Sequence, residues 1–415
     1  MKRAIVLSGG GGKGAYQIGV WKALRKKKIH YDIVTGTSVG ALNGALMTQK
    51  EYHKAVLLWQ KIDFSAIFKE ADSQKLMAQK DWFHIFQTYL QNVLNGGMEI
   101  SNLEKLVQKN VNTKKIKNSK IDFGIVTVNF RTLKPLILTK NEMTEDTICD
   151  YLIASASCFP FFQKKEVKNE FFIDGGFYDN MPINLAIDLG AEEIIAVDLN
   201  AVGMVRPVKN KKIPITYIKP RNEIGSFLVF DKKQSHRAIK LGYLDTLKVL
   251  GYFDGNQYTF PKNSLSKNQK IKEIKMQKII EEIFNTKNES LLEEFLNKTS
   301  FNRVSKQEKE VNRTLEYLAK HCNLDETKVY RLKTMEKKIR QTIREVPLIT
   351  KESLDKKRQE FKFVPTPLER IKYFYTYIKE AKTHPKMKKE LSKYALVFPK
   401  DFLAAIYLTA MEAKK

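Results

Sequence analysis

The sequence predicts an α/β fold, in which a mostly parallel sheet is flanked by helices and followed by a helical C-terminal extension. Three observations support this prediction. An apolar run at residues 3–8 leads through a glycine-rich turn into a helical pattern at 15–28. A second short run at 31–35 leads through another glycine-containing turn into a helical segment at 39–48. From residue 267 onward the sequence is rich in Lys and Glu and nearly free of glycine, which is typical of helices.

This order of elements indicates a parallel sheet whose faces are covered by helices: strand, turn, helix, strand, sharp turn, helix. Residues at about 50–120 have a mostly helical pattern with many aromatic side chains, and we expect them to form a helical cap. The aromatic side chains of this cap would line an acyl channel or simply fill its core. Further strands are predicted at residues 121–130, 136–139, 171–173, 193–200 and 215–219.

Length and composition together predict two domains. A chain of 415 residues is long enough for one large core or two. We place the boundary between residues 262 and 263, so that 1–262 form the α/β domain and 263–415 a Lys-rich helical region. The sequence assigns no role to the second region. Its aromatic residues are expected to form a core: Phe361, Phe363, Tyr373, Phe374, Tyr375 and Tyr377.

The net charge of +27 is spread along the whole chain. Residues 265–415 carry 35 Lys and Arg against 21 Asp and Glu, which leaves about half of the excess to the first 264 residues. Two interpretations stay open: solvated, lysine-rich helix faces, or attraction to an anionic surface. For the second, peripheral contact with an anionic membrane is favoured over nucleic acid as the partner.

No segment approaches the roughly 18 consecutive apolar residues of a membrane span. The apolar run Ala4–Leu7 is too short for a signal peptide and is better explained as a first strand. We expect a cytoplasmic protein without metal or other cofactor, and the sequence leaves its oligomeric state open. The three cysteines have neither metal-ligand nor disulfide spacing and suit a reducing compartment: Cys149, Cys158 and Cys322.

A glycine-rich loop follows the first predicted strand and opens the first helix, where backbone N–H groups converge at the positive helix end. A phosphate-binding P-loop requires Ser or Thr after the lysine, but Gly14 stands there. A dinucleotide-binding fingerprint stays open, because the glycine spacing fits and Asp32 lies near the expected acidic position. The third interpretation is an oxyanion hole that stabilises developing negative charge. The loop comprises Gly9, Gly10, Gly11, Gly12, Lys13 and Gly14.

The segment GTSVG at 36–40 matches the G-x-S-x-G pattern between a strand and a helix, where a nucleophile elbow lies. Gly36 and Gly40 remove Cβ clashes, so that the turn can expose the hydroxyl of Ser38. Alternatively, Ser38 or Thr37 caps the helix that follows. The glycine loop so close before this turn favours Ser38 as a nucleophile.

A nucleophilic serine needs a base. Asp174 ends an apolar strand and is followed by Gly175 and Gly176, and catalytic groups of α/β folds gather at such strand ends. Asp174 could serve Ser38 directly if proton transfer is coupled to attack and an oxyanion hole stabilises the charge. The alternative is a triad in the order Ser38, Asp174, His236. We favour the dyad, because none of the six histidines lies in a glycine-marked turn after a strand.

These motifs resemble the patatin-like phospholipase family, the bacterial acyl hydrolases related to plant patatins. The resemblance covers residue 1 to about residue 260. It rests on SGGGGKG at Ser8–Gly14, GTSVGALNGAL at Gly36–Leu46, DGGFYDNMP at Asp174–Pro182, Ala154-Ser155 with Pro160 and Phe162, and Phe227–Asp231 followed by Ile239–Thr246.

The resemblance implies a patatin-like three-layer fold and a serine esterase of the phospholipase A type, which cleaves lipid carboxylic esters through an acyl-enzyme without a metal. It implies Ser38 as nucleophile, Asp174 as general base and the glycine loop as oxyanion hole. Two departures are Lys13, where many members carry Arg, and Val39, where small residues are common. A lipid acyltransferase, or a domain recruited mainly for basic docking to a membrane or partner, are the alternatives. The lipid head group, acyl position and chain length stay open.

Overall fold

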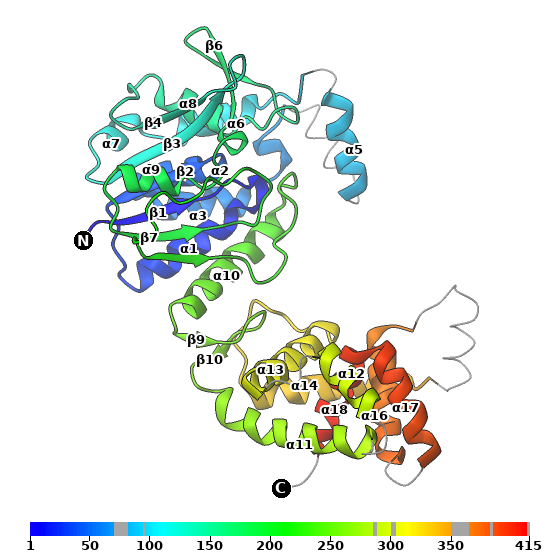
Figure 1. The fold of residues 1–415 in the computed structure, drawn as a ribbon. Helices are drawn as coiled ribbons and strands as arrows, with labels where there is room; N and C mark the ends of the chain where they lie inside the picture. Colours follow the sequence, from blue (N-terminus) through cyan, green and yellow to red (C-terminus); the bar gives the residue numbers. More distant parts are fainter. Residues whose placement is uncertain are drawn as a thin grey trace. The chain divides into compact units, whose positions relative to one another are not determined.

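The computed structural model describes residues 1–69, 82–93, 96–284, 289–299, 304–349, 365–381 and 385–412. The chain forms two compact units, Met1–Val249 and Leu250–Lys415, and each is described by itself (Figure 1). The assignment of residues 1–262 to one catalytic domain stays a prediction.

The first unit is built on an eight-stranded, mostly parallel sheet, which confirms the predicted fold class (Figure 1). Its parallel strands lie side by side in this order: β3 (Asp122–Asn129), β2 (Ile33–Thr37), β1 (Arg3–Leu7), β7 (Glu193–Val197) and β8 (Ile215–Ile218). Three strands add antiparallel pairs at the β3 side: β4 (Pro135–Thr139), β5 (Lys165–Val167) and β6 (Glu170–Asp174).

Side chains of β1 alternate between the two faces of the sheet, as the two-residue period of a strand requires. Ala4 and Val6 pack on one face with α9 (Ile183–Asp188). Ile5 and Leu7 join a larger core on the other face. The helices that contribute to this larger core include α1 (Ala15–Lys26), α2 (Val39–Thr48), α3 (Tyr52–Lys61), α8 (Ile148–Ser155) and α10 (Lys232–Val249).

The predicted helical cap at about 50–120 is helical over most of its described residues. Besides α3 it contains the 3-10 turn η2 (Phe64–Ala66), α5 (Trp82–Val93), α6 (Ser101–Asn110) and α7 (Thr113–Lys117). Its residues 70–81, 94 and 95 lie outside the described ranges. Ile67, Leu103 and Val107 from this segment belong to the larger core of the first unit.

The second unit is helical apart from a short hairpin, β9 (Phe253–Asp254) with β10 (Phe260–Pro261). Its core surrounds α18 (Pro399–Glu412), which is buried at every residue from Asp401 to Ala410. Tyr373 and Phe374 are buried in this core and Tyr375 and Tyr377 pack against it, as predicted, whereas Phe361 and Phe363 lie outside the described residues. The other helices are α11 (Ser266–Phe284), α12 (Glu289–Thr299), α13 (Val304–His321), α14 (Leu332–Glu345), α16 (Pro367–Ala381) and α17 (Pro385–Val397).

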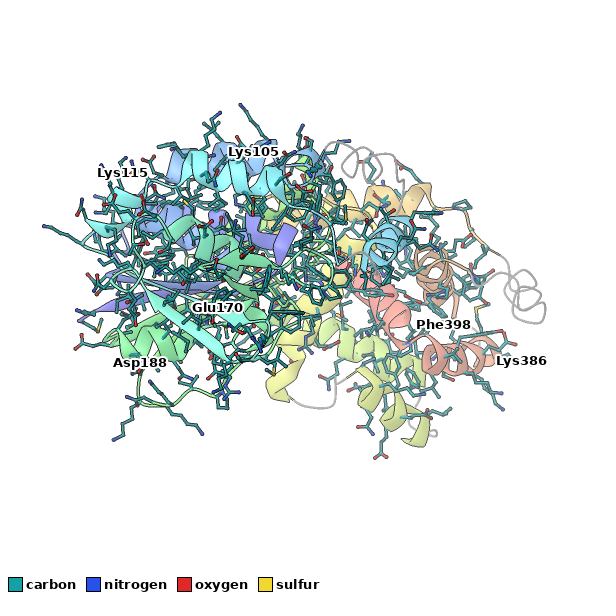
Figure 2. All side chains as sticks on the ribbon, turned by 90° about the horizontal axis from the view of Figure 1, so that it is seen from above. Lys105, Lys115, Glu170, Asp188, Lys386 and Phe398 are labelled. Carbon is teal, nitrogen blue, oxygen red and sulfur yellow. The ribbon has the colours of Figure 1, made fainter. Side chains whose placement is uncertain are left out.

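Lysine side chains are exposed on both units. Lys105 and Lys115 lie at the rim of the first unit in Figure 2, and Lys386 at that of the second. Lys115 pairs with Glu51 at 2.7 Å, an exposed ion pair of small energetic value. Within the described ranges, no helix is both long and apolar enough to traverse a bilayer.

Candidate active site

Ser38 and Asp174 are brought together by two strands that share one edge of β3. β2 runs parallel to β3 and ends at Thr37, opposite Val126. β6 runs antiparallel and ends at Asp174, opposite Thr127, the next residue of β3. β4 occupies the other edge of β3 over these residues. The two strands therefore meet end to end, and Ser38 follows β2 where Asp174 ends β6.

The backbone at Ser38 has the strained geometry of a nucleophile elbow. Its φ of 58° and ψ of −130° are rare for a residue with a side chain. The Ser38 N–H donates to Oγ of Ser155 at 3.0 Å, and the Ser155 hydroxyl donates to the Val126 carbonyl at 2.7 Å. This chain of hydrogen bonds ties the elbow to α8 and β3.

The capping alternative is not supported by the hydrogen bonds. The side chain of Ser38 makes no capping hydrogen bond with α2. The Thr37 hydroxyl donates to the carbonyl of Asp179 at 2.7 Å, away from the helix end. The glycines of the motif allow close packing, since a Cβ at Gly40 would lie 2.2 Å from the Leu7 carbonyl oxygen.

Asp174 is a buried carboxylate, only 5% exposed. Burial raises its pKa to about 6, against the opposing effect of hydrogen bonds from the Ser38 side chain and the Gly176 N–H. The Gly176 N–H donates to Oδ1 at 2.7 Å. At Gly175 a Cβ would meet the Val126 carbonyl oxygen at 2.1 Å, so only glycine fits directly after the acid. Such a carboxylate is ionised at neutral pH and more basic than an exposed one.

The amides of the glycine loop are not equally free. Gly9 donates its N–H to the carbonyl of Asn180 at 3.0 Å, and Gly12 to that of Phe227 at 2.8 Å. Among the described residues, the N–H groups of Gly10 and Gly11 have no acceptor. Gly11 adopts a φ of 51°, a left-handed conformation that favours glycine. The part of the predicted oxyanion hole that is available for a ligand thus narrows to Gly10 and Gly11.

Lys13 and Gly14 close the loop. The Lys13 N–H donates to the Gly10 carbonyl at 3.1 Å and its ammonium group to the Asn200 carbonyl at 3.1 Å. Gly14 precedes α1 and accepts a hydrogen bond through its carbonyl. Both residues therefore support the loop, and neither is among those that line the cavities next to Ser38.

A buried polar network that the sequence did not predict connects the loop to the elbow helix. The Asn43 amide donates to the Gly14 carbonyl at 3.1 Å and to Oε1 of Gln17 at 2.8 Å. Gln17 in turn donates to the Ser8 carbonyl at 2.8 Å, and the Trp59 indole donates to Oδ1 of Asn43 at 2.9 Å. The available signal was one amide side chain in each of two apolar stretches, Gln17 within residues 15–21 and Asn43 within residues 39–47.

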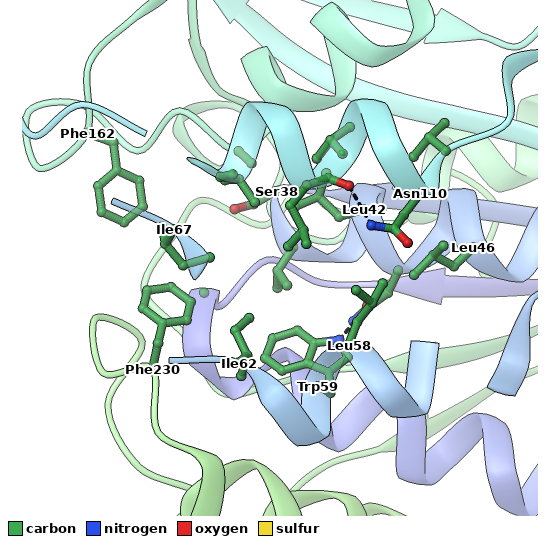
Figure 3. A pocket seen from close by; sticks show the side chains of 18 residues that line it. Ser38, Leu42, Leu46, Leu58, Trp59, Ile62, Ile67, Asn110, Phe162 and Phe230 are labelled. Atoms are coloured by element: carbon green, nitrogen blue, oxygen red, sulfur yellow. Dashed lines mark hydrogen bonds between the residues drawn. The ribbon is translucent and has the colours of Figure 1, made fainter. Parts of the chain in front are cut away.

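Two cavities meet at Ser38, and both include Gly11, Ser38 and Phe162 in their walls. The first cavity lies between α2, α3 and α6 (Figure 3) and holds about 800 Å³ of empty space, part of it open to solvent. Among the described residues, no charged side chain lines it. Its walls include Leu42, Leu46, Leu58, Ile62, Leu106 and Val107.

The second cavity contains the acid. Its lining includes Gly10, Ser38, Asp174 and Asn180, together with the aromatic segment 159–162. Ser38, Asp174 and the two unpaired loop amides therefore share one apolar space, in which charges interact more strongly than in water.

Two alternatives from the sequence do not fit this arrangement. His236 lies exposed on α10, and within the described part of the chain no histidine lines either cavity. Asp32 precedes β2 and accepts the Arg3 N–H at 3.0 Å, so it lies at the amino-terminal ends of β1 and β2, whereas the glycine loop follows the carboxyl end of β1. A dinucleotide site would need this acid at the other end of β2. In the described ranges, His, Cys, Asp and Glu side chains form no group of three suited to a metal ion.

Comparisons with known proteins agree with these motifs. The family model described as Patatin-like phospholipase matches residues 5–187. Patatin-like phospholipase domain-containing protein 7 of Mus musculus is 23% identical over 211 residues, which are 48% of this chain and 14% of the mouse protein. Lysophospholipase nte1 of Aspergillus terreus is 27% identical over 199 residues, 48% of this chain and 12% of the fungal protein.

Solved structures give a weaker likeness. The crystal structure of VipD from Legionella pneumophila is 14% identical and has a TM-score of 0.40, covering 100% of this chain and 93% of that one.

Proposed function

Residues 5–187 of this chain belong to the patatin-like phospholipase family, and on this premise we propose that the protein is a lipid acyl hydrolase that works through a Ser38–Asp174 dyad. Its substrate class is a phospholipid or related lipid with a carboxylic ester. The observation that supports the proposal most is the junction of β2 and β6, where a strained serine lies beside a buried carboxyl group in an apolar cavity.

In the proposed reaction, Oγ of Ser38 attacks the ester carbonyl carbon while Asp174 takes the hydroxyl proton. The N–H groups of Gly10 and Gly11 hold the oxyanion of the tetrahedral intermediate. The C–O bond to the lipid alcohol breaks, and Asp174 returns its proton to the leaving oxygen. Water then attacks the acyl-enzyme, again losing a proton to Asp174, and the fatty acid leaves as Ser38 is reprotonated.

We assign the first cavity to the acyl chain. Leu42 and Leu46 lie one turn apart on α2 and share one helix face, and Ser38, at the N-cap of this helix, lines the same cavity. Along this face the cavity extends about 12 Å from Ser38 to Leu46, given the rise of a helix. An acyl chain lying there would leave its carbonyl carbon at Ser38.

A digest of a mixed phospholipid and glyceride pool tests the function. Wild-type protein should release free fatty acids and the matching lyso- or deacylated lipids, and Ser38→Ala should release none above background. The identity of the consumed lipid gives the head group and acyl position. Fatty acid release that is equal with both proteins would contradict the proposal. Acyl transfer to a lipid alcohol in place of release would favour the acyltransferase alternative.

Leu46→Trp should shift the enzyme toward shorter acyl chains. The larger side chain fills the end of the first cavity that lies farthest from Ser38 along α2. We expect kcat/KM for a p-nitrophenyl palmitate to fall about tenfold or more relative to p-nitrophenyl butyrate. Leu57→Trp, at an exposed position of α3 outside this cavity, is the matched control and should leave the ratio unchanged. An unchanged ratio in Leu46→Trp would remove the acyl assignment of this cavity.

A further inference from the structure

A buried asparagine lines the second cavity without a hydrogen-bond partner for its side chain. Asn180 is 4% exposed and shares this cavity with Ser38 and Asp174. Among the described residues, its side-chain amide makes no hydrogen bond. A buried amide without a partner costs free energy, so a native protein keeps one where it serves a purpose. The proposed dyad and oxyanion hole give Asn180 no role.

Glycines leave the room that the Asn180 side chain occupies. A Cβ at Gly9 would lie 2.3 Å from Oδ1 of Asn180, and a Cβ at Gly203 would lie 2.7 Å from its Cβ. A Cβ at Gly176 would lie 3.1 Å from the same Oδ1. Contacts under 3 Å are too short for a real Cβ, so a larger residue at Gly9 or Gly203 would displace the asparagine. The glycines thus hold the amide in one place.

The amide oxygen of Asn180 lies close to both members of the dyad. The Cβ position of Gly9, next to this oxygen, is also 3.1 Å from Cβ of Ser38. The Cβ position of Gly176 is 3.1 Å from Oδ1 of Asn180 and 3.1 Å from Oδ1 of Asp174. The amide oxygen and the carboxylate therefore border the same small space beside the nucleophile.

Both oxygens that border this space are hydrogen-bond acceptors. An ionised carboxylate only accepts, and its two oxygens have room for more partners than the Gly176 N–H and the Ser38 side chain; an amide oxygen also only accepts. A molecule that bridges Asp174 and Asn180 must therefore carry two donor hydrogens on one atom. Water carries two, whereas the hydroxyl of an alcohol carries one.

We propose that Asn180 is a further catalytic residue, whose Oδ1 accepts a hydrogen bond from the water that hydrolyses the acyl-enzyme. The inference rests on the proposed function and concerns its second half. The water oxygen bonds to the acyl carbon, and one of its protons passes to Asp174 and then to Oγ of Ser38 as the Oγ–C bond breaks. The other hydrogen points at Asn180 during the attack and stays on the product acid, so the water is held in one orientation.

This arrangement favours hydrolysis over acyl transfer. An alcohol that attacks the acyl-enzyme gives its only hydroxyl proton to Asp174 and has none left for Asn180. The hydrogen bond to Asn180 therefore stabilises the attack of water and not that of an alcohol. Without this bond, the balance between the two acceptors should shift toward the alcohol.

Partitioning of the acyl-enzyme between water and methanol tests the proposal. The protein hydrolyses p-nitrophenyl butyrate in buffer that contains methanol, and butyrate and methyl butyrate are measured at early times. The ratio of methyl butyrate to butyrate should rise about tenfold in Asn180→Leu, which keeps the side-chain shape without an acceptor, and similarly in Asn180→Ala. The initial burst of p-nitrophenol reports acylation, and its rate should stay within about threefold of the parent.

The backbone bonds of Asn180 do not depend on its side chain, so the variants should fold. Its N–H donates to the Met204 carbonyl at 2.5 Å, and its carbonyl accepts the Gly9 N–H at 3.0 Å. Asn184→Ala, on α9 and outside both cavities, is the matched control and should keep the parental ratio. An unchanged ratio, a rise in only one Asn180 variant, or an equal loss of burst and hydrolysis rates would overturn the proposal. If the parent forms neither product above the Ser38→Ala background, the hydrolase proposal itself fails, and this inference with it.

Discussion

Ser38→Ala is expected to lower kcat/KM for a short, soluble p-nitrophenyl ester by at least about 10³-fold, because the nucleophile of the acyl-enzyme pathway is lost. The residual rate would come from the Gly10 and Gly11 amides and from binding alone. A soluble ester separates chemistry from any membrane step. The measurement is steady-state hydrolysis with matched protein concentrations.

The variant should fold normally. The Ser38 side chain makes no helix cap, and its backbone N–H still reaches Ser155 when the hydroxyl is absent. Thermal unfolding should therefore differ little from the parent. Ser119→Ala is the matched control, since the Ser119 hydroxyl donates to the Thr48 carbonyl away from both cavities. Retention of more than a tenth of the activity in Ser38→Ala would exclude Ser38 as the nucleophile.

Asp174→Asn should lower kcat/KM by about 10² to 10⁴-fold, the usual contribution of a general base. The amide keeps the shape of the side chain and an oxygen that can accept the Gly176 N–H, but it cannot take the Ser38 proton. His236→Ala, at an exposed position of α10, should retain the parental rate. Loss of activity in folded His236→Ala together with a mild effect of Asp174→Asn would support the triad and contradict the dyad.

The pH dependence follows from the same carboxylate. Burial raises the pKa of Asp174 to about 6, and only the ionised form can accept the proton. For the parent, kcat/KM should rise about tenfold per pH unit below that pKa and level off above it. The residual activity of Asp174→Asn should lack this inflection. A parental profile that is flat from pH 4 to 8 would contradict the assigned base.

The contribution of Asp174 to the free energy of unfolding should fall as the pH rises, whereas kcat/KM should rise. A carboxyl whose pKa is raised on folding favours the folded state below its unfolded pKa, and this contribution is lost as the pH rises through about 6. At pH 8 the buried charge therefore costs on the order of 3 kcal/mol, which Asp174→Asn removes. We expect the variant to be more stable than the parent at pH 8 and about equal at pH 4, measured by urea unfolding. A variant less stable at both pH values would show that the Asp174 side chain stabilises the fold more than its buried charge destabilises it.

The sequence predicted the local elements of the site because their turn chemistry is local. The predicted ranges of β1, α1 and α2 are close to the observed ranges, since glycines mark the turn between each strand and the helix that follows it. β2 runs to Thr37, two residues beyond its expected end, because pairing with β3 continues to Val126. Strand ends depend on such partners, which a single strand does not reveal.

The way Ser38 and Asp174 meet could not be predicted. It depends on β6 running antiparallel to β3 and on β4 occupying the other edge, and both are pairings between distant segments. The narrowing of the oxyanion hole to Gly10 and Gly11 has the same origin. The N–H groups of Gly9 and Gly12 donate hydrogen bonds to the carbonyl groups of Asn180 and Phe227, which lie far along the chain.

The loop 201–205 carries no catalytic motif and was not singled out from the sequence. The hydrogen bonds of Met204 to the segment after Asp174 hold this loop beside the second cavity, with Val202 exposed. The net charge alone left a membrane surface and solvated helix faces equally open.

Trapping the acyl-enzyme tests the central claim, a covalent intermediate on Ser38 formed with the help of Asp174, most directly. The protein is mixed with p-nitrophenyl butyrate, quenched in acid within the first turnover, digested and examined by mass spectrometry. We predict one butyryl group on the peptide that contains Ser38, formed much more slowly in Asp174→Asn and absent from Ser38→Ala. A butyryl group on another residue, or rapid hydrolysis with no acylated peptide, would contradict the account.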